Sequence, residues 1–235
     1  MNLVIDFGNS AGKAALFEKE EIIKIFNPVR LEEISHIYNS HLIDNILISS
    51  TGVDPAMINK HVNNQGQILS YKSKLPFILE YKTPETLGLD RIAAVAGATF
   101  LFPEKNCLVI DMGTCITYDV LIENKHLGGG ISPGINMRLK ALHTFTANLP
   151  LVELQNEVAL VGDTTQSAIL SGVVNGVKAE IEEIIRMYSD NYGSLQIIIC
   201  GGDCVFFENK LKASIFAAPE LVLRGLNGIL QYNVS

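Results

Sequence analysis

The chain has 235 residues, 48% of them hydrophobic, and a formal net charge of -7. This length and apolar content are sufficient for one large core or two smaller ones without disulfide or metal cross-links. The acidic balance excludes an extended nucleic-acid-binding surface, because contact with a phosphate backbone requires clusters of Lys and Arg. We therefore expect one or two globular domains and no nucleic-acid partner.

The sequence predicts neither a targeting segment nor a membrane segment. The start of the chain, MNLVIDFGNS, has neither the basic region nor the apolar core of a signal peptide. The longest apolar stretch, RIAAVAGATFLF at 91–102, is too short to cross a bilayer. The cysteines form no CxxC pair, so we expect reduced thiols in a cytoplasmic protein at Cys107, Cys115, Cys200 and Cys204.

The first half of the chain alternates strand-length apolar runs with amphipathic stretches, which is typical of α/β proteins. Three strands close together in the sequence are expected to be antiparallel, at 2–6, 12–18 and 21–26. They are followed by helix, strand, helix and strand at 30–40, 45–50, 54–62 and 67–71. A loop at 83–90 then leads to an apolar helix at 91–103, with Gly88 ending the loop.

The second half repeats this layout. Strands are predicted at 107–111, 115–122 and 125–131, and helices at 134–145 and 164–188. A strand at 195–200, a helix after Gly202, a strand at 214–218 and a closing helix from Pro219 complete the chain. The repeat predicts a duplicated α/β protein with domains at 1–95 and 96–235.

Each half begins with an acidic turn, DFGNS at 6–10 and DMGTC at 111–115. Glycine lets backbone N–H groups approach a phosphate, the hydroxyl residue adds a donor, and the Asp can hold the accompanying cation. A duplicated domain would direct both turns toward one cleft that holds a nucleotide. The alternative is a pair of hairpins that share only packing, but Lys13, Thr114 and Thr117 supply charge and donors that packing does not need.

Further motifs resemble the type III pantothenate kinases, within the superfamily of actin, heat-shock chaperone ATPases and sugar kinases. The most specific is YKTPETLGLDR at 81–91, which is similar to the family's pantothenate loop. The others follow in the family's order: GGGISPG at 128–134, TANLP at 146–150, GDTTQSAILSG at 162–172, CGGD at 200–203 and PELVLRGL at 219–226. The resemblance covers about residues 3–230. It implies two ribonuclease H-like domains of the actin-like ATPase fold, with mixed five-stranded sheets and flanking helices.

The resemblance also assigns the nucleotide site. Asp111 would hold a monovalent cation, K⁺ or NH₄⁺, and Mg²⁺ would accompany ATP. Ser10 stands where the family more often has Thr, which keeps the hydroxyl. The ATP-binding residues implied are Asp6, Phe7, Gly8, Asn9, Ser10, Ala11, Gly12, Lys13 and Thr114.

For the acceptor, the resemblance implies a pantothenate pocket made of Tyr81, Gly88, Leu89, Asp90 and Arg91, with Asp90 as the catalytic base. A primary hydroxyl needs a carboxylate to take its proton, and Arg91 can bind the pantothenate carboxylate through two parallel hydrogen bonds. The plain alternative for this Asp-Arg pair is an N-cap Asp followed by a surface Arg.

Thr165 would reach pantothenate from the neighbouring subunit of a homodimer. Thr164 or Thr165 is also expected to cap the following helix, and the alignment leaves open which of them contacts substrate. Gly201 and Gly202 are suited either to close approach of adenosine or to a tight turn.

The expected function is therefore ATP-dependent phosphorylation of pantothenate to 4′-phosphopantothenate, the first step of coenzyme A biosynthesis. One alternative is a kinase of another small hydroxy acid in the same superfamily. A second is a catalytically inactive homologue with an accessory role in transcription. The complete set Asp6, Asp90, Arg91 and Asp111 favours an active enzyme.

Overall fold

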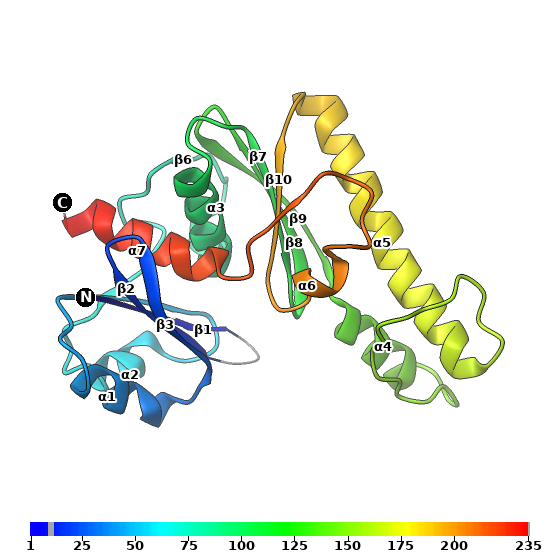
Figure 1. The fold of residues 1–235 in the computed structure, drawn as a ribbon, viewed down its shortest axis with the longest axis horizontal. Helices are drawn as coiled ribbons and strands as arrows, with labels where there is room; N and C mark the ends of the chain where they lie inside the picture. Colours follow the sequence, from blue (N-terminus) through cyan, green and yellow to red (C-terminus); the bar gives the residue numbers. More distant parts are fainter. Residues whose placement is uncertain (9–11, 235) are drawn as a thin grey trace. The chain divides into compact units, whose positions relative to one another are not determined.

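The computed structural model describes residues 1–8 and 12–234. It consists of two compact units (Figure 1). The first unit contains Met1–Lys105, Leu121–Gly128 and Glu220–Ser235, and the second contains Asn106–Val120 and Gly129–Pro219. In the described part of the chain, no helix is both long enough and apolar enough to cross a membrane.

The first unit is built on a five-stranded sheet in the order β3-β2-β1-β4-β5. β1 is antiparallel to β2 and parallel to β4, β2 is antiparallel to β3, and β4 is parallel to β5. The strands are β1 (Asn2–Phe7), β2 (Gly12–Glu18), β3 (Glu21–Val29), β4 (Asn45–Ser50) and β5 (Gln67–Ile68).

Helices cover both faces of this sheet. Figure 1 shows α1 (Leu31–Asn39) and α2 (Pro55–Lys60) on one face, and α3 (Leu89–Leu101) and α7 (Leu221–Val234) on the other. Leu3 and Ile5 of β1 belong to one core cluster with residues of α1 and α2. Because side chains alternate along a strand, Asp6 at the end of β1 points to the opposite face, on which α3 packs.

A sheet of six strands runs in the order β11-β10-β7-β8-β9-β6. Its strands are β6 (Ile78–Leu79), β7 (Cys107–Met112), β8 (Cys115–Ile122), β9 (Lys125–Pro133), β10 (Gln196–Cys200) and β11 (Phe216–Ala217). β10 is parallel to both β7 and β11, and β6 is parallel to β9.

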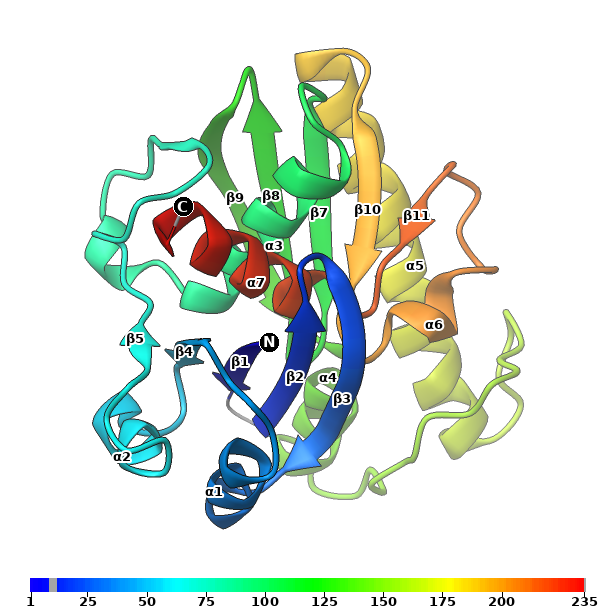
Figure 2. The same ribbon diagram turned by 60° about the vertical axis from the view of Figure 1, so that its left-hand side comes forward.

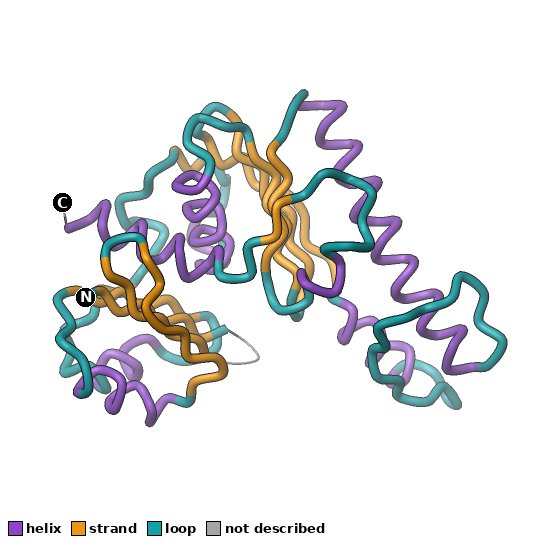
Figure 3. The backbone as a smooth tube through the Cα atoms, viewed as in Figure 1, coloured by secondary structure: helices purple, strands orange, loops and turns teal. Residues whose placement is uncertain are grey.

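In the second unit the long helix α5 (Thr165–Tyr192) runs along one face of β7 and β10 (Figure 2). α4 (Ile135–Thr144) packs against α5, and the short α6 (Cys204–Phe207) follows β10. Figure 3 shows the strands of this unit side by side, with the purple tube of α5 next to them. Cys107 lies in the core, where burial raises the pKa of its thiol to about 11, as expected for a packing residue.

The predicted strands at 45–50 and 115–122 agree with β4 and β8, and the helix predicted at 164–188 extends to Tyr192. The sixth strand of the second sheet, β6, was not predicted. It is only two residues long and exists through its pairing with residues distant in the chain, so no local apolar pattern marks it. A short 3₁₀ helix, η1 (Pro84–Thr86), lies within the predicted loop.

The compact units group residues differently from the domains predicted at 1–95 and 96–235, because α7 at the end of the chain packs against α3. The duplication into these two sequence domains stays a prediction.

Candidate active site

The first acidic turn follows β1, and its aspartate lies between two neighbouring strands. Strand register places Asp6 opposite Lys13 on β2 and opposite Ser49 on β4. The next residue, Phe7, is held at the strand end because its carbonyl oxygen accepts hydrogen bonds from the backbone N–H groups of Thr51 (2.9 Å) and Gly52 (3.2 Å).

Of the residues predicted to line the ATP phosphates, Asp6, Phe7, Gly8, Gly12 and Lys13 are therefore together at one end of the first sheet. Three others lie outside the described residues: Asn9, Ser10 and Ala11.

The environment of Asp6 disfavours its charge. Asp6 keeps some exposed area, but protein atoms surround its carboxylate densely, and this burial raises its pKa from 3.8 to about 6. The Ser49 hydroxyl and the Lys13 ammonium oppose the rise, whereas the charge of Asp90 adds to it. The Ser49 hydroxyl is buried and faces Asp6, although it makes no hydrogen bond of ordinary geometry among the described residues. Asp6 and Asp90 thus form a pair of carboxylates close enough to repel each other.

Asp90 is positioned by the start of α3. The helix is capped by Gly88, so Asp90 is the second helical residue, in the turn where the helix dipole stabilises a carboxylate. Its Oδ1 accepts a hydrogen bond from the backbone N–H of Arg91 (2.9 Å). The carboxylate also lies directly over Gly88, where a Cβ atom would collide with Oδ1. The N-cap interpretation of Asp90 is therefore wrong, since Gly88 occupies the cap position.

Arg91 is buried, with 5% of its area exposed, so the interpretation of a surface Arg is also wrong. Its guanidinium carbon lies 5.8 Å from the centroid of the Tyr81 ring, within the range of a cation–π interaction. Leu89 opens α3 beside Asp90 and is partly buried. Four of the five residues predicted to form the pantothenate pocket therefore lie at the N-terminal end of α3, and the fifth, Tyr81, contacts Arg91 there.

The second acidic turn follows β7 in the second unit. Asp111 pairs with Cys200 of the parallel strand β10. Gly201, which follows Cys200, has φ of +86°, a value that favours glycine. A Cβ atom at Gly201 would collide with Oδ1 of Asp111. The backbone N–H of Asp203 donates to the carbonyl of Met112 (2.9 Å), which ties the CGGD segment to the acidic turn.

Thr114 is exposed at the tip of this turn. Its carbonyl oxygen accepts a hydrogen bond from the backbone N–H of Gly134 (3.1 Å). A Cβ atom at Gly134 would collide with the carbonyl of Gly113. The segment GGGISPG therefore packs against the second turn, and its last glycine, Gly134, permits close contact with the backbone of Gly113 and Thr114.

A polar network that the sequence did not reveal holds this segment. Glu180 of α5 accepts hydrogen bonds from the Tyr118 hydroxyl (2.8 Å), the Ser132 hydroxyl (2.5 Å) and Nη2 of Arg138 (2.6 Å). Nε of Arg138 also donates to the carbonyl of Pro133 (2.7 Å). Burial acts in the opposite direction, but the three hydrogen bonds lower the pKa of Glu180 below its ordinary value. The four side chains come from β8, β9, α4 and α5, so no spacing in the sequence predicts that they meet.

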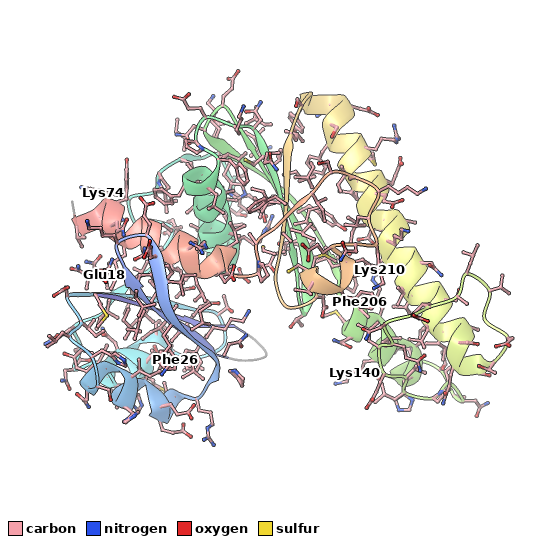
Figure 4. All side chains as sticks on the ribbon, viewed as in Figure 1. Glu18, Phe26, Lys74, Lys140, Phe206 and Lys210 are labelled. Carbon is pink, nitrogen blue, oxygen red and sulfur yellow. The ribbon has the colours of Figure 1, made fainter. Side chains whose placement is uncertain are left out.

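Near the CGGD segment, Nζ of Lys210 lies 3.9 Å from the centroid of the Phe206 ring and donates to the Phe206 carbonyl (2.9 Å). Figure 4 shows these two side chains together beside α6. Burial raises the pKa of Asp203 above its ordinary value.

Thr165 lines a cavity of about 890 Å³ between α4 and α5. The cavity wall is mainly apolar and includes Leu142, Phe145, Ile169 and Val173. Thr164 is the N-cap of α5, and its hydroxyl accepts a hydrogen bond from the backbone N–H of Ser167 (3.1 Å). The expected cap is therefore Thr164, and Thr165 is the threonine that faces the cavity.

Among the described residues, no group of three or more His, Cys, Asp or Glu side chains could hold a metal ion. Mg²⁺ in kinases is commonly held by one or two carboxylates together with substrate phosphates and water. The neighbouring carboxylates of Asp6 and Asp90 fit such a site.

Comparison with known proteins gives consistent matches over the whole chain. The family model described as type III pantothenate kinase matches residues 2–187. Proteins named type III pantothenate kinase are 43% identical in Christiangramia forsetii (99% of each chain) and 40% identical in Cytophaga hutchinsonii (100% of each chain).

Among solved structures, a Campylobacter jejuni protein described as a proposed Baf family transcriptional activator aligns with a TM-score of 0.65 and 24% identity, over 99% of this chain and 98% of that one. A proposed 2-dehydro-3-deoxygalactonokinase from Sinorhizobium meliloti aligns with a TM-score of 0.57 and 14% identity, over 99% of each chain. At these identities the structures support the predicted fold, and they say nothing about the substrate.

Proposed function

Since the chain belongs to the type III pantothenate kinase family, we propose that Asp90 is the base of its reaction and that Asp6, Asp111 and Thr114 serve the nucleotide. The reaction itself is the ATP-dependent phosphorylation of pantothenate in coenzyme A biosynthesis. Because ATP is the donor, we place this activity in the cytoplasm.

The position of Asp90 carries the proposal. Its carboxylate lies in the first turn of α3, is oriented by the Arg91 backbone, and is close enough to Asp6 to add to the rise in pKa that burial causes there. Phosphoryl transfer has a loose transition state, so the protein chiefly positions groups and neutralises charge. A base beside the phosphate-binding turn is suited to accept the proton of the attacking hydroxyl. The adjacent Arg91 is suited to bind the pantothenate carboxylate.

Bound cations would offset the negative charge of these carboxylates. The repulsion between Asp6 and Asp90 would be relieved by Mg²⁺ bound with the ATP phosphates, and Lys13 adds a positive charge on the neighbouring strand. We assign the monovalent cation, K⁺ or NH₄⁺, to Asp111. When bound, these ions supply neutralisation of phosphate charge, and the chain supplies the oxygen ligands and their orientation.

A homodimer is supported by the apolar surface around the Thr165 cavity. Phe145, Leu160 and Val161 of the second unit are 85%, 80% and 79% exposed. Apolar side chains this exposed, beside an apolar cavity, are typical of a surface that another chain covers. A second copy seated here would present its own Thr165 near the interface, as expected for a residue that reaches the pantothenate of the neighbouring subunit.

The test measures ADP release by the purified protein with ATP, Mg²⁺, K⁺ and pantothenate, together with a panel of other hydroxy acids. Asp90→Asn should lower kcat by about 10²- to 10⁴-fold while leaving ATP binding intact. The matched control is Asp54→Asn in the same unit, because Asn preserves the N-cap that Asp54 provides for α2. If Asp90→Asn turns over like the parent, the base is another residue.

The cation assignment has a separate readout. Replacing K⁺ by a bulky organic cation should reduce activity of the parent. Asp111→Asn should lose this dependence on K⁺, and an unchanged dependence would place the ion elsewhere.

A further inference from the structure

His126 is a fully buried histidine, with 0% of its area exposed, to which the proposed reaction assigns no role. It lies on β9 in the part of the chain that belongs to the first unit. β6 pairs beside it, with Leu79 opposite His126 and the Glu80 backbone N–H donating to the His126 carbonyl (3.0 Å). This pairing brings the segment just before the pantothenate loop against the histidine.

The imidazole of His126 contacts two aromatic rings. The Phe77 ring meets it edge-on, at a centroid distance of 5.9 Å and an interplanar angle of 88°. The Tyr81 ring stacks on it, at 6.4 Å and 17°. The Arg91 guanidinium in turn lies over Tyr81 at 5.8 Å. A continuous series of side chains therefore leads from the buried histidine to the arginine expected to bind pantothenate.

Tyr81 depends on these contacts for its position. It belongs to no helix or strand, so backbone hydrogen bonding within an element does not fix it. Its ring also lies against Gly128, where φ is +100° and a Cβ atom would come within 2.9 Å of the ring. His126 and Gly128 are two residues apart on β9 and therefore face the same side of the strand. Together they form the surface on which Tyr81 rests.

We propose that His126 is a positioning residue for the pantothenate site: its ring sets the orientation of Tyr81, and through Tyr81 that of Arg91. The proposal rests on the assignment of Tyr81 and Arg91 to pantothenate made above. Stacked aromatic side chains stabilise each other beyond the burial of their surfaces, so removal of the His126 ring would remove part of the interaction that holds the Tyr81 ring. The expected consequence is weaker binding of pantothenate with normal binding of ATP.

The experiment compares the KM values of the two substrates in His126→Ala and His126→Phe. Removing the ring should raise the KM for pantothenate about three- to tenfold, because an aromatic pair contributes interaction of that size. The KM for ATP should stay at the parent value. His126→Phe keeps a flat ring and should restore most of the pantothenate affinity. If Ala changes both KM values together, or if Phe fails to restore the affinity, the proposal is wrong.

Two further variants separate positioning from loss of stability. Ile58→Ala removes another fully buried side chain of the first unit, so it should lower Tm but leave the KM for pantothenate unchanged. Gly128→Ala keeps the His126 side chain but pushes on the Tyr81 ring and strains the backbone at φ of +100°, so it should raise the KM for pantothenate even if His126→Ala fails to fold. A normal KM in Gly128→Ala would overturn the proposal.

Tyr81→Ala tests the underlying assignment. If it binds pantothenate like the parent, the proposed pocket is wrong. If it loses affinity while both the His126 and Gly128 variants keep theirs, only the positioning role is wrong.

Discussion

Asp6→Asn is expected to stabilise the ligand-free protein while impairing the kinase, because the fold penalises the charged form of Asp6. Burial, with a contribution from Asp90, raises the pKa of Asp6 from 3.8 to about 6. A tenfold change in acidity corresponds to about 1.4 kcal/mol, so at neutral pH the charge costs the folded state at most about 3 kcal/mol. The amide of Asn is neutral and of nearly the same size, so the variant avoids this cost.

The stability advantage of Asp6→Asn over the parent should increase as the pH rises. In acid, below the ordinary pKa of Asp, the folded and unfolded chains both hold the proton, and the substitution removes no charge. As the pH rises, the unfolded chain loses its proton first, so the parent loses stability relative to the variant until the pH passes the folded-state pKa. The advantage of Asp6→Asn should therefore grow by roughly 1 kcal/mol between about pH 5 and about pH 8.

Urea unfolding of the two proteins at a series of pH values measures this difference. Glu20→Gln is the matched control, because it removes one carboxylate from the exposed turn after β2 of the same unit. Mg²⁺ and ATP should stabilise the parent more than Asp6→Asn, since bound cations need the carboxylate. A variant that is less stable than the parent at high pH, or a difference that does not change with pH, would refute the reasoning.

Three other substitutions test the second unit. Glu180→Ala leaves three hydrogen-bond donors without their acceptor, so thermal or urea unfolding should show a loss of about 1–3 kcal/mol. Glu183→Ala on the same helix should cost much less, because its ion pair with Arg186 is exposed to solvent. Gly134→Ala should displace the second acidic turn through the Gly113 carbonyl, raising the KM for ATP with little change in the KM for pantothenate. Phe145→Glu should shift the protein to monomer in sedimentation and abolish turnover if the exposed apolar surface forms the dimer; a dimer that survives would place the interface elsewhere.

The sequence predicted the positions of residues that depend on the local apolar pattern. It did not predict contacts that depend on how distant strands pair. The apolar runs that lead to Asp6 and Asp111 located both strand ends to within one residue. The helix predicted from residue 91 begins two residues earlier, at Leu89. Ser49 was missed because its place beside Asp6 depends on the parallel pairing of β1 with β4. The support of Tyr81 by His126 was missed for the same reason, since it depends on β6 pairing with β9.

The same register shows how the two acidic turns correspond. In each case the aspartate is the next-to-last residue of its strand and pairs with one of the last two residues of a parallel neighbour, Asp6 with Ser49 and Asp111 with Cys200. The neighbours then differ in chemistry. In the first unit the neighbour is Ser49, whose buried hydroxyl lowers the pKa of the carboxylate, and in the second the chain continues into Gly201, whose backbone comes close to the carboxylate.

This difference argues for unequal roles of the two aspartates. A carboxylate with a raised pKa beside a second carboxylate, as at Asp6, gains most from a divalent cation, whose charge offsets both. Asp111 has backbone packed closely against its carboxylate, an arrangement that suits a less strongly hydrated monovalent ion with mixed carboxylate and carbonyl ligands. Asp6→Asn should therefore weaken the dependence of activity on Mg²⁺ and Asp111→Asn the dependence on K⁺. Variants that alter both dependences equally would mean that the two turns serve one shared ion.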